Sequence, residues 1–258
     1  MALVERGLFP SRARAQAAVL AGRVRVAGEP VAKPGAPVAE GADIEAADAP
    51  EYVSRGGLKL ADALDRLGLD VAGARAIDLG ASTGGFTDCL LSRGAAEVVA
   101  VDVGYGQLAW RLRTDPRVHV RERTNVRALR ADDLPYAPDL AVADLSFISV
   151  ATAWPAVAPL LDPAHRALVL CKPQFEAGRA AVGSGGVVRD PAARADAARR
   201  VASALEAAGG TVQRVLLADP PGPKGNRELF LLAAGPGRHS RPADLEAEIA
   251  AAVGAADA

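Results

Sequence analysis

Several residue types are scarce in this sequence, and each scarcity excludes a class of protein. The 258-residue chain has two cysteines, Cys89 and Cys171, which lie far apart and lack metal-ligand spacing. We therefore expect neither a disulfide framework nor a zinc site, and no other metal is required. No charge-free run of about 18 apolar residues is present, which argues against a membrane span. Charged residues interrupt the apolar stretch at the N-terminus, so no secretory signal is indicated and we expect a cytoplasmic protein.

Lysine is also rare, because nearly all of the basic residues are arginines. The lysines are Lys33, Lys59, Lys172 and Lys224. A lysine can lose its proton in a buried site or approach a hydroxyl as a compact donor, whereas a guanidinium group stays charged. Each lysine is therefore a candidate for a chemical role. The formal net charge of -1 identifies no partner, because a neutral total can conceal a basic patch.

The segment 1–49 has the pattern of a small separate α+β unit. Apolar residues at 3–8 and 13–20 fit two short helices, with Ser11 as the N-cap of the second and Gly22 at its end. Short strands are expected at 24–26, 31–34 and 38–44, joined by turns that contain Gly and Pro. Such a unit is too small to have a large core.

The residues of this segment resemble a known RNA-binding unit. The runs Leu3-Val4-Glu5-Arg6-Gly7-Leu8, Ser11-Arg12-Ala13-Arg14-Ala15-Gln16 and Gly22-Arg23-Val24-Arg25-Val26-Ala27-Gly28 are similar to the alpha-L RNA-binding module. That module occurs in a ribosomal protein, in pseudouridine synthases and in tyrosyl-tRNA synthetases, and it usually begins with an Arg-Leu-Asp stretch that is absent before Leu3. Closely spaced guanidinium groups can engage RNA phosphates, although a solvated arginine face is the alternative. The candidate RNA-binding residues are Arg6, Arg12, Arg14, Arg23 and Arg25.

The remaining chain alternates strands with alanine-rich helices, which predicts a Rossmann-like, doubly wound α/β domain over 58–258. A hinge-like linker is expected at 50–57. The last strand should run antiparallel, because the connection before it is rich in Pro and Gly and too broken for a crossover helix. The seven expected strands are 75–79, 97–102, 118–121, 139–143, 166–171, 211–216 and 228–233. This is the strand count of an S-adenosylmethionine-dependent methyltransferase.

A glycine-rich turn follows the first of these strands and leads into a helix. Small residues there let the backbone approach a ligand closely, as in dinucleotide-binding turns, but the spacing is not GxGxxG. Asp78 at the strand end would repel a pyrophosphate and suits the cationic amino-acid portion of S-adenosylmethionine. The turn consists of Asp78, Leu79, Gly80, Ala81, Ser82, Thr83, Gly84, Gly85 and Phe86.

Two more residues fit the same cofactor. Asp102 ends the second strand about twenty residues on, where a carboxylate can accept hydrogen bonds from both ribose hydroxyls, although NAD enzymes share that feature. Asn125 follows the third strand and can contact the adenine edge or act as an ordinary turn residue. A purely structural turn is the alternative for the whole motif, and Asp78 with Asp102 argues against it.

Four polar residues should meet at one edge of the expected sheet. Lys59 precedes the first strand, Asp144 and Lys172 end the fourth and fifth, and Glu228 opens the seventh. Open α/β sheets bind ligands at that edge. Any one lysine–carboxylate pair is usually a surface ion pair, but four such residues at one edge favour a catalytic site.

These motifs resemble those of the TlyA family of ribosomal RNA ribose methyltransferases, some of which are labelled haemolysins, and more distantly those of the FtsJ/RrmJ methyltransferases. The runs that carry the resemblance are Ser54-Arg55-Gly56-Gly57-Leu58-Lys59-Leu60, Ala143-Asp144-Leu145-Ser146-Phe147, Leu170-Cys171-Lys172-Pro173-Gln174-Phe175-Glu176 and Asn226-Arg227-Glu228-Leu229-Phe230. The resemblance covers nearly the whole chain. It implies a catalytic tetrad of Lys59, Asp144, Lys172 and Glu228 that methylates a ribose 2'-oxygen of ribosomal RNA in a ribosomal subunit.

The tetrad residues suit that chemistry, because a ribose hydroxyl is a poor nucleophile at neutral pH. A buried lysine beside another cation can serve as base or orient the oxygen, and Lys172 is the first candidate. Asp144 would also lie near the sulfonium. Arg55, Arg189 and Lys224 are candidate RNA contacts or merely exposed, and Phe147, Phe175 and Phe230 are candidates for stacking on a flipped-out nucleotide or are core aromatics.

We expect a monomeric enzyme that binds ribosomal RNA and no membrane. Two other functions remain open. One is an RNA-binding ribosome-assembly factor that retains the cofactor fold without turnover. The other is a membrane-lytic protein, for which the sequence has no amphipathic or spanning element.

Overall fold

The computed structural model describes residues 2–9, 11–20, 22–31, 33–39, 41–46, 51–238 and 244–256. The chain forms two compact units, Met1–Glu51 and Tyr52–Ala258. Among the described residues, no helix is both long and apolar enough to cross a membrane.

The N-terminal unit contains two short helices and a small sheet. The helices are α1 (Ala2–Glu5) and α2 (Arg12–Leu20), and the antiparallel strands β1 (Val24–Val26), β2 (Glu29–Pro30) and β3 (Ile44–Ala46) are ordered β2-β1-β3. The expected N-cap is confirmed, because Ser11 Oγ accepts a hydrogen bond from the Arg14 backbone N–H at 3.3 Å. Gly22 ends α2 with φ +66°.

Two of the expected strands in this unit are wrong. Ala27 and Gly28 both have positive φ, so they form a two-residue turn that pairs Val26 with Glu29. The second strand therefore begins at Glu29 and has ended before the expected segment 31–34. The third strand begins only at Ile44, at the end of the expected segment 38–44.

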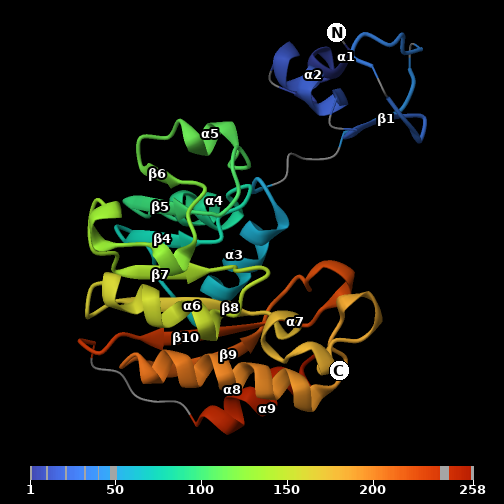
Figure 1. Ribbon diagram of the computed structural model, residues 1–258. Coiled ribbons are helices and arrows are strands. Elements are labelled where there is room, and N and C mark those ends of the chain that lie inside the picture. Colours follow the sequence, from blue (N-terminus) through green and yellow to red (C-terminus); the bar gives the residue numbers. More distant parts are fainter. Residues whose placement is uncertain are drawn as a thin grey trace. The chain divides into compact units, whose positions relative to one another are not determined.

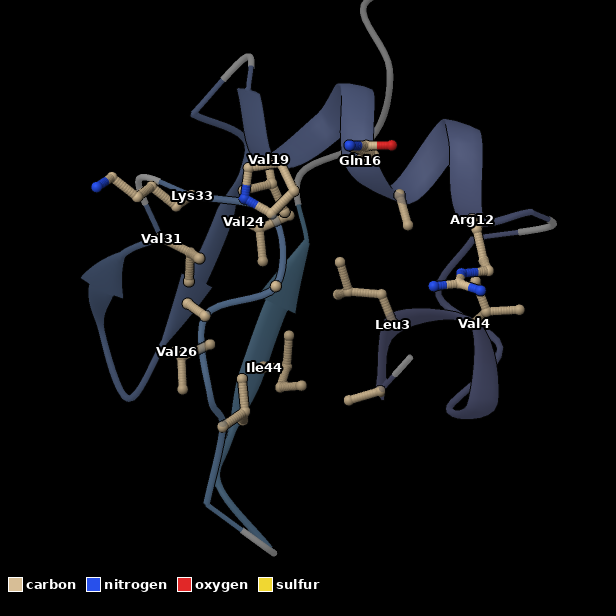
Figure 2. Close-up of a pocket in the computed structure, with 16 residues that line it drawn as sticks. Leu3, Val4, Arg12, Gln16, Val19, Val24, Val26, Val31, Lys33 and Ile44 are labelled. Carbon is tan, nitrogen blue, oxygen red and sulfur yellow. The ribbon is translucent and has the colours of Figure 1, made fainter.

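The interior of the N-terminal unit is sparsely filled. Among the described residues of this unit, the core cluster consists of the buried residues Ala18, Val19 and Val24. Beside them lies a cavity of about 460 Å³ lined mainly by apolar side chains, with Arg12 and Lys33 on opposite sides of it (Figure 2). So few buried apolar groups give this unit little stabilisation from the hydrophobic effect.

The second unit has the expected seven-stranded, three-layer α/β architecture. Its strands are β4 (Arg75–Leu79), β5 (Glu97–Val101), β6 (Val118–Arg121), β7 (Leu140–Ala143), β8 (Arg166–Cys171), β9 (Thr211–Leu217) and β10 (Leu229–Ala234). They are ordered β6-β5-β4-β7-β8-β10-β9. β4 to β8 run parallel, whereas β10 is antiparallel to both β8 and β9, which confirms the expected reversal.

Helices cover both faces of this sheet (Figure 1). Successive side chains of a strand point to opposite faces of the sheet. Ile77, Val99 and Ala141 therefore pack on one face, and Ala76, Val98 and Leu140 pack on the other. The first face is covered by α6 (Val150–Val157), α8 (Pro191–Ala207) and α9 (Leu245–Gly254), and the second by α3 (Arg55–Leu67) and α4 (Gly85–Ser92). The shorter helices α5 (Trp110–Arg113) and α7 (Pro173–Glu176) lie in the connections.

The expected linker over 50–57 is too long at its C-terminal end. Tyr52 is buried, and residues 55–57 already form the first turn of α3. Gly57 packs so closely that a Cβ there would lie 2.3 Å from the Tyr52 Cβ atom. The Val53 backbone N–H also donates to Asp88 Oδ2 at 2.8 Å. These contacts anchor residues 52–57 to the second unit.

Candidate functional site

The expected polar residues meet at one edge of the sheet because of the strand directions. The carboxyl ends of β4, β7 and β8 lie side by side, and the register pairs Leu229, the first residue of β10, with Cys171 at the end of β8. Asp144 follows β7, Lys172 follows β8 and Glu228 precedes β10. Lys59, which lies on α3, contacts the Glu228 carboxylate. The antiparallel last strand thus places Glu228 beside residues that end parallel strands.

The first lysine–carboxylate pair is sealed from solvent. Lys59 Nζ lies 2.5 Å from Glu228 Oε2, and the side chains are 8% and 1% exposed. Gln174 Nε2 donates to the other carboxylate oxygen, Oε1, at 3.2 Å. Gly222 closes the remaining side, since a Cβ there would lie 2.6 Å from Glu228 Oε1. A buried carboxylate is stable only with such partners, so this pair is a fixed structural unit.

The second pair is more accessible. Lys172 Nζ lies 2.7 Å from Asp144 Oδ1, and the side chains are 12% and 27% exposed. Asp144 Oδ1 has no hydrogen-bond partner within the described part of the chain, so the contact is an ion pair without hydrogen-bond geometry. Lys172 Nζ instead donates to Ser146 Oγ at 2.8 Å. The exposure of this pair makes it the one that a substrate can approach.

The glycine-rich turn adjoins the second pair. Gly80, Ser82 and Gly84 have positive φ, and a Cβ on Gly80 would lie 2.7 Å from the Asp144 carbonyl oxygen. A side chain at position 80 would therefore separate the turn from Asp144. Beyond the turn, Asp102 accepts hydrogen bonds from the Ser82 and Gly104 backbone N–H groups at 2.8 and 2.6 Å. The turn is thus fixed between β5 and the end of β7.

Asp78 lies beneath the turn and is fully buried. Its Oδ2 accepts hydrogen bonds from the backbone N–H and the hydroxyl of Thr87 at 3.0 and 2.7 Å, whereas Oδ1 has no partner among the described residues. Burial raises the pKa of Asp78 to about 7. An unpartnered carboxylate oxygen at this point fits the cationic amino group of the S-adenosylmethionine that the sequence predicts.

Comparisons with known proteins identify the family of this chain. A family model described as FtsJ-like methyltransferase matches residues 52–235, and an S4 domain model matches residues 1–44. The chain belongs to the FtsJ-like methyltransferase family. The expected fold class, with a small RNA-binding module before the methyltransferase domain, is therefore confirmed.

Individual relatives match most of this methyltransferase. The 16S/23S rRNA (cytidine-2'-O)-methyltransferase TlyA of Mycobacterium tuberculosis is 49% identical over 89% of this chain and 86% of its own length. Hemolysin A of Brachyspira hyodysenteriae is 40% identical over 71% of this chain and 77% of its own length. A solved structure, described as a candidate hemolysin from Streptococcus thermophilus, has a TM-score of 0.77 and 37% identity, covering 99% of this chain and 93% of that chain. The resemblance to the TlyA family is thus confirmed.

Two expected cofactor contacts also have structural roles in this methyltransferase. Asn125 caps a 3-10 helix (Val126–Ala128), because its Oδ1 accepts a hydrogen bond from the Arg127 backbone N–H at 3.0 Å. The Phe86 ring is buried and lies 6.1 Å from that of Phe230 between ring centroids. Phe230 is therefore a core aromatic. The ring of Phe86 belongs to the core, and its backbone belongs to the start of α4.

Phe147 differs from these core aromatics, because it is 93% exposed. Its φ of +65° is unusual for a bulky residue, and its ring lies 5.5 Å from that of Phe175 between centroids. Gln174, Phe175 and Arg179 line a cavity of about 460 Å³ beside Phe147. This exposed ring is available for stacking at the accessible pair.

The candidate RNA-binding arginines are mostly on the surface. Arg23 is half-buried, whereas Arg6, Arg12, Arg14, Arg25 and Arg55 are exposed. Some of them are already engaged: Arg6 donates to the Ala42 carbonyl at 2.6 Å, and Arg25 to that of Gly28 at 2.9 Å. Arg55 donates to the Pro221 carbonyl at 3.0 Å and so helps to hold the connection before β10. Arg189 and Lys224 are exposed.

Sequence reasoning assigned no role to several residues that hold the site together. Thr87 binds Asp78, Gln174 binds Glu228, and Ser146 binds Lys172. Asn226 is buried and joins two loops, because it accepts from the Val188 N–H at 3.2 Å and donates to the Gly186 carbonyl at 2.9 Å. Ser146, Gln174 and Asn226 each lie two residues from a motif aspartate, lysine or glutamate, and Thr87 directly follows the glycine-rich turn, which was the available signal.

Proposed function

We propose that this chain transfers a methyl group from S-adenosylmethionine to a ribose 2'-oxygen of ribosomal RNA. The position of the accessible Lys172–Asp144 pair against the glycine-rich turn supports the proposal most directly. Methyl transfer requires the acceptor oxygen and the methyl donor to be held together in line. A cofactor turn that contacts the backbone of a catalytic aspartate meets that requirement.

The four residues of the tetrad have different roles in the proposed reaction. Lys172 accepts the proton of the ribose hydroxyl or orients its oxygen, and Asp144 holds the Lys172 ammonium group by charge. Glu228 keeps the buried Lys59 in place as a second cation. S-adenosylmethionine supplies the electrophilic methyl group on a sulfonium. The protein contributes position and electrostatics, and no metal is needed for this chemistry.

The cofactor would be held by residues of three strand ends. We propose that the Asp78 carboxylate receives the amino group and that Asp102 receives the ribose hydroxyls. The backbone of the turn would contact the amino-acid portion through Gly80, Ala81, Ser82, Thr83, Gly84, Gly85 and Phe86. We propose that Asn125 contacts the adenine edge through the amide nitrogen that its capping bond leaves unused.

The S4 domain would supply affinity for the substrate. Its exposed arginines suit the phosphates of a structured RNA, and Arg55 would add a contact from the methyltransferase domain. The relative from M. tuberculosis is named for cytidine 2'-O-methylation of 16S and 23S rRNA, so we propose a cytidine of a ribosomal subunit as acceptor. The chain would act as a monomer, beside ribosomes in the cytoplasm.

The test is methyl transfer from labelled S-adenosylmethionine to purified small and large ribosomal subunits, followed by nucleoside analysis. We expect 2'-O-methylcytidine with the wild-type protein and none with Lys172→Ala, while Lys172→Ala still binds the subunits. Wild-type protein that binds subunits and cofactor without transferring methyl would instead identify an assembly factor. Ser203→Ala, an exposed change on α8, is the control for handling and folding.

A further inference from the structure

The two lysine–carboxylate pairs have different neutral partners. In the sealed pair, the partner is the Gln174 amide, which contacts the carboxylate of Glu228. In the accessible pair, it is the Ser146 hydroxyl, which contacts the ammonium group of Lys172. The neutral group therefore touches the anion in one pair and the cation in the other.

This difference matters for the lysine to which the proposed function gives the ribose proton. An amide N–H can only donate, so Gln174 bonds the Glu228 carboxylate and offers Lys59 nothing. A hydroxyl oxygen accepts a hydrogen bond from an ammonium group and equally from a neutral amine, which keeps two N–H groups and a free lone pair. Ser146 can therefore stay bonded to Lys172 whether or not Lys172 carries the extra proton. Asp144 can only accept while it is ionised, and it binds the charged form.

The chain segment that carries Ser146 is held in place by its neighbours. Two residues after Phe147, Ser149 Oγ donates to the buried Glu176 carboxylate at 2.5 Å, and the Val150 backbone N–H donates to it at 2.6 Å. Glu176 lies on the same short helix that begins after Lys172. The segment with Ser146 and the segment with Lys172 are thus tied together beyond the contact itself. Ser146 remains exposed, so it faces the side that a substrate approaches.

We propose that Ser146 is a positioning residue that holds Lys172 Nζ through both of its protonation states. The inference rests on the proposed function. The ribose 2'-oxygen would lose its proton to Lys172 Nζ as its bond to the methyl carbon forms and the bond from that carbon to sulfur breaks, leaving the electron pair on sulfur, and Lys172 would later pass the proton to water. Ser146 keeps its own proton throughout and accepts a hydrogen bond from Nζ both before and after the transfer, which leaves the lone pair of the neutral amine free for the ribose proton.

The experiment compares Ser146→Ala, Ser146→Thr and the control Ser203→Ala in the full-length protein, with ribosomal subunits as substrate. Single-turnover methyl transfer gives the rate of the chemical step, and separate titrations give the Kd for S-adenosylmethionine and for the subunits. For Ser146→Ala we expect a rate about tenfold lower, because positioned acid–base groups contribute that much or more. Both Kd values should stay within about twofold, and Ser146→Thr, which restores the hydroxyl, should recover most of the rate.

The outcomes separate this inference from the proposed function. Wild-type protein without methyl transfer would overturn both. An active wild type with an equally fast Ser146→Ala would overturn only the role of Ser146. The same holds if Ser146→Thr is as slow as Ser146→Ala, or if the loss follows weaker binding, since a packing role would then suffice. A slow Ser146→Ala with unchanged binding and rescue by threonine supports the proposal.

Discussion

At Asp78, the proposed contact with the cofactor conflicts with the stability of the fold. Its carboxyl is fully buried, yet one of its two oxygens has no hydrogen-bond partner in the described part of the chain. Burial raises its pKa to about 7 from an ordinary value near 3.8. The folded protein therefore binds this proton more tightly than the unfolded chain, and the contribution of Asp78 to stability falls as the pH rises from about 4 to about 7.

We expect Asp78→Asn to stabilise the cofactor-free protein at pH 8 while weakening cofactor binding. The uncharged amide avoids the cost of a buried charge, and its oxygen can still accept both bonds from Thr87. The gain in unfolding free energy should be on the order of 2 to 4 kcal/mol at pH 8 and should vanish as the pH is lowered toward 4. Chemical denaturation at both pH values measures it, with the exposed change Asp132→Asn as control.

Cofactor titration completes this prediction. If Asp78 meets the amino group, Asp78→Asn should raise the Kd for S-adenosylmethionine at least about tenfold, as expected when a charged partner is lost. Binding by the wild type should also weaken as the pH falls below about 7, because the protonated carboxyl no longer attracts a cation. An unchanged Kd in Asp78→Asn would contradict the proposed contact.

Gly222 offers a test of the sealed pair that leaves its charged groups in place. A Cβ at this position would lie 2.6 Å from Glu228 Oε1, whereas one at Gly254 would have nothing within 4 Å. Neither glycine has a positive φ, so backbone strain does not enter. We expect Gly222→Ala to displace the Glu228 carboxylate and to lower the rate of methyl transfer at least about tenfold, with Gly254→Ala near wild type. Equal rates for the two variants would show that the geometry of the sealed pair is not critical.

At the scale of the elements, several contacts join the chain segments that follow two neighbouring strands. The segment after β7 and the segment after β8 are joined by the Lys172–Asp144 ion pair, by the rings of Phe147 and Phe175, and by Glu176. Glu176 also caps α6, because its carboxylate accepts hydrogen bonds from Ser149 and Val150 at the start of that helix. Burial raises the pKa of Glu176, which shows the cost of placing the cap inside the protein.

We expect Glu176→Ala to lower both stability and activity. Removing the cap leaves buried donors without a partner, which should reduce the free energy of unfolding by about 1 to 3 kcal/mol. Methyl transfer should fall as well, because the segment that carries Asp144 loses its anchor. Urea denaturation and single-turnover rates measure the two effects, with Glu206→Ala, an exposed change on α8, as the matched control. A stable but inactive variant would mean that Glu176 acts on the chemistry directly.

The elements that could be predicted from the sequence are those that repeat one physical pattern. The boundaries of β4 and β8 follow from apolar runs that a parallel sheet buries on both faces, and the Pro/Gly-rich connection indicated the reversed last strand. Strand ends then placed Lys172 and Glu228 at one edge. The division into a sealed and an accessible pair was not predictable, because it depends on contacts between residues more than 25 positions apart. The short strands near Glu29 and Ile44 also escaped prediction, since a tight turn fixes the first and pairing with β1 fixes the second, and neither depends on periodicity.

At the scale of the whole molecule, the proposed function assigns affinity for RNA to the S4 domain and the chemistry to the methyltransferase domain. Arg12 and Arg14 are exposed on α2, and no acceptor within the described residues engages either guanidinium group. Phosphate contacts of this kind release counterions, so their number determines how steeply binding falls with salt. We therefore expect the double variant Arg12→Gln/Arg14→Gln to bind ribosomal subunits more weakly while its Kd for S-adenosylmethionine is unchanged.

The salt dependence gives this expectation a quantitative form. If both arginines contact phosphates, the slope of log K against log salt concentration should become shallower by about 1.4 to 1.8, from roughly 0.7 to 0.9 per phosphate contact. Arg199→Gln is the control, because that residue is already paired with Glu246 and Asp196 on the methyltransferase domain. Weaker binding with an unchanged slope would mean that the arginines shape the S4 domain without touching phosphate. In single turnovers at saturating subunit concentration, the double variant should recover the wild-type rate, because the proposed catalytic tetrad lies entirely in the other domain.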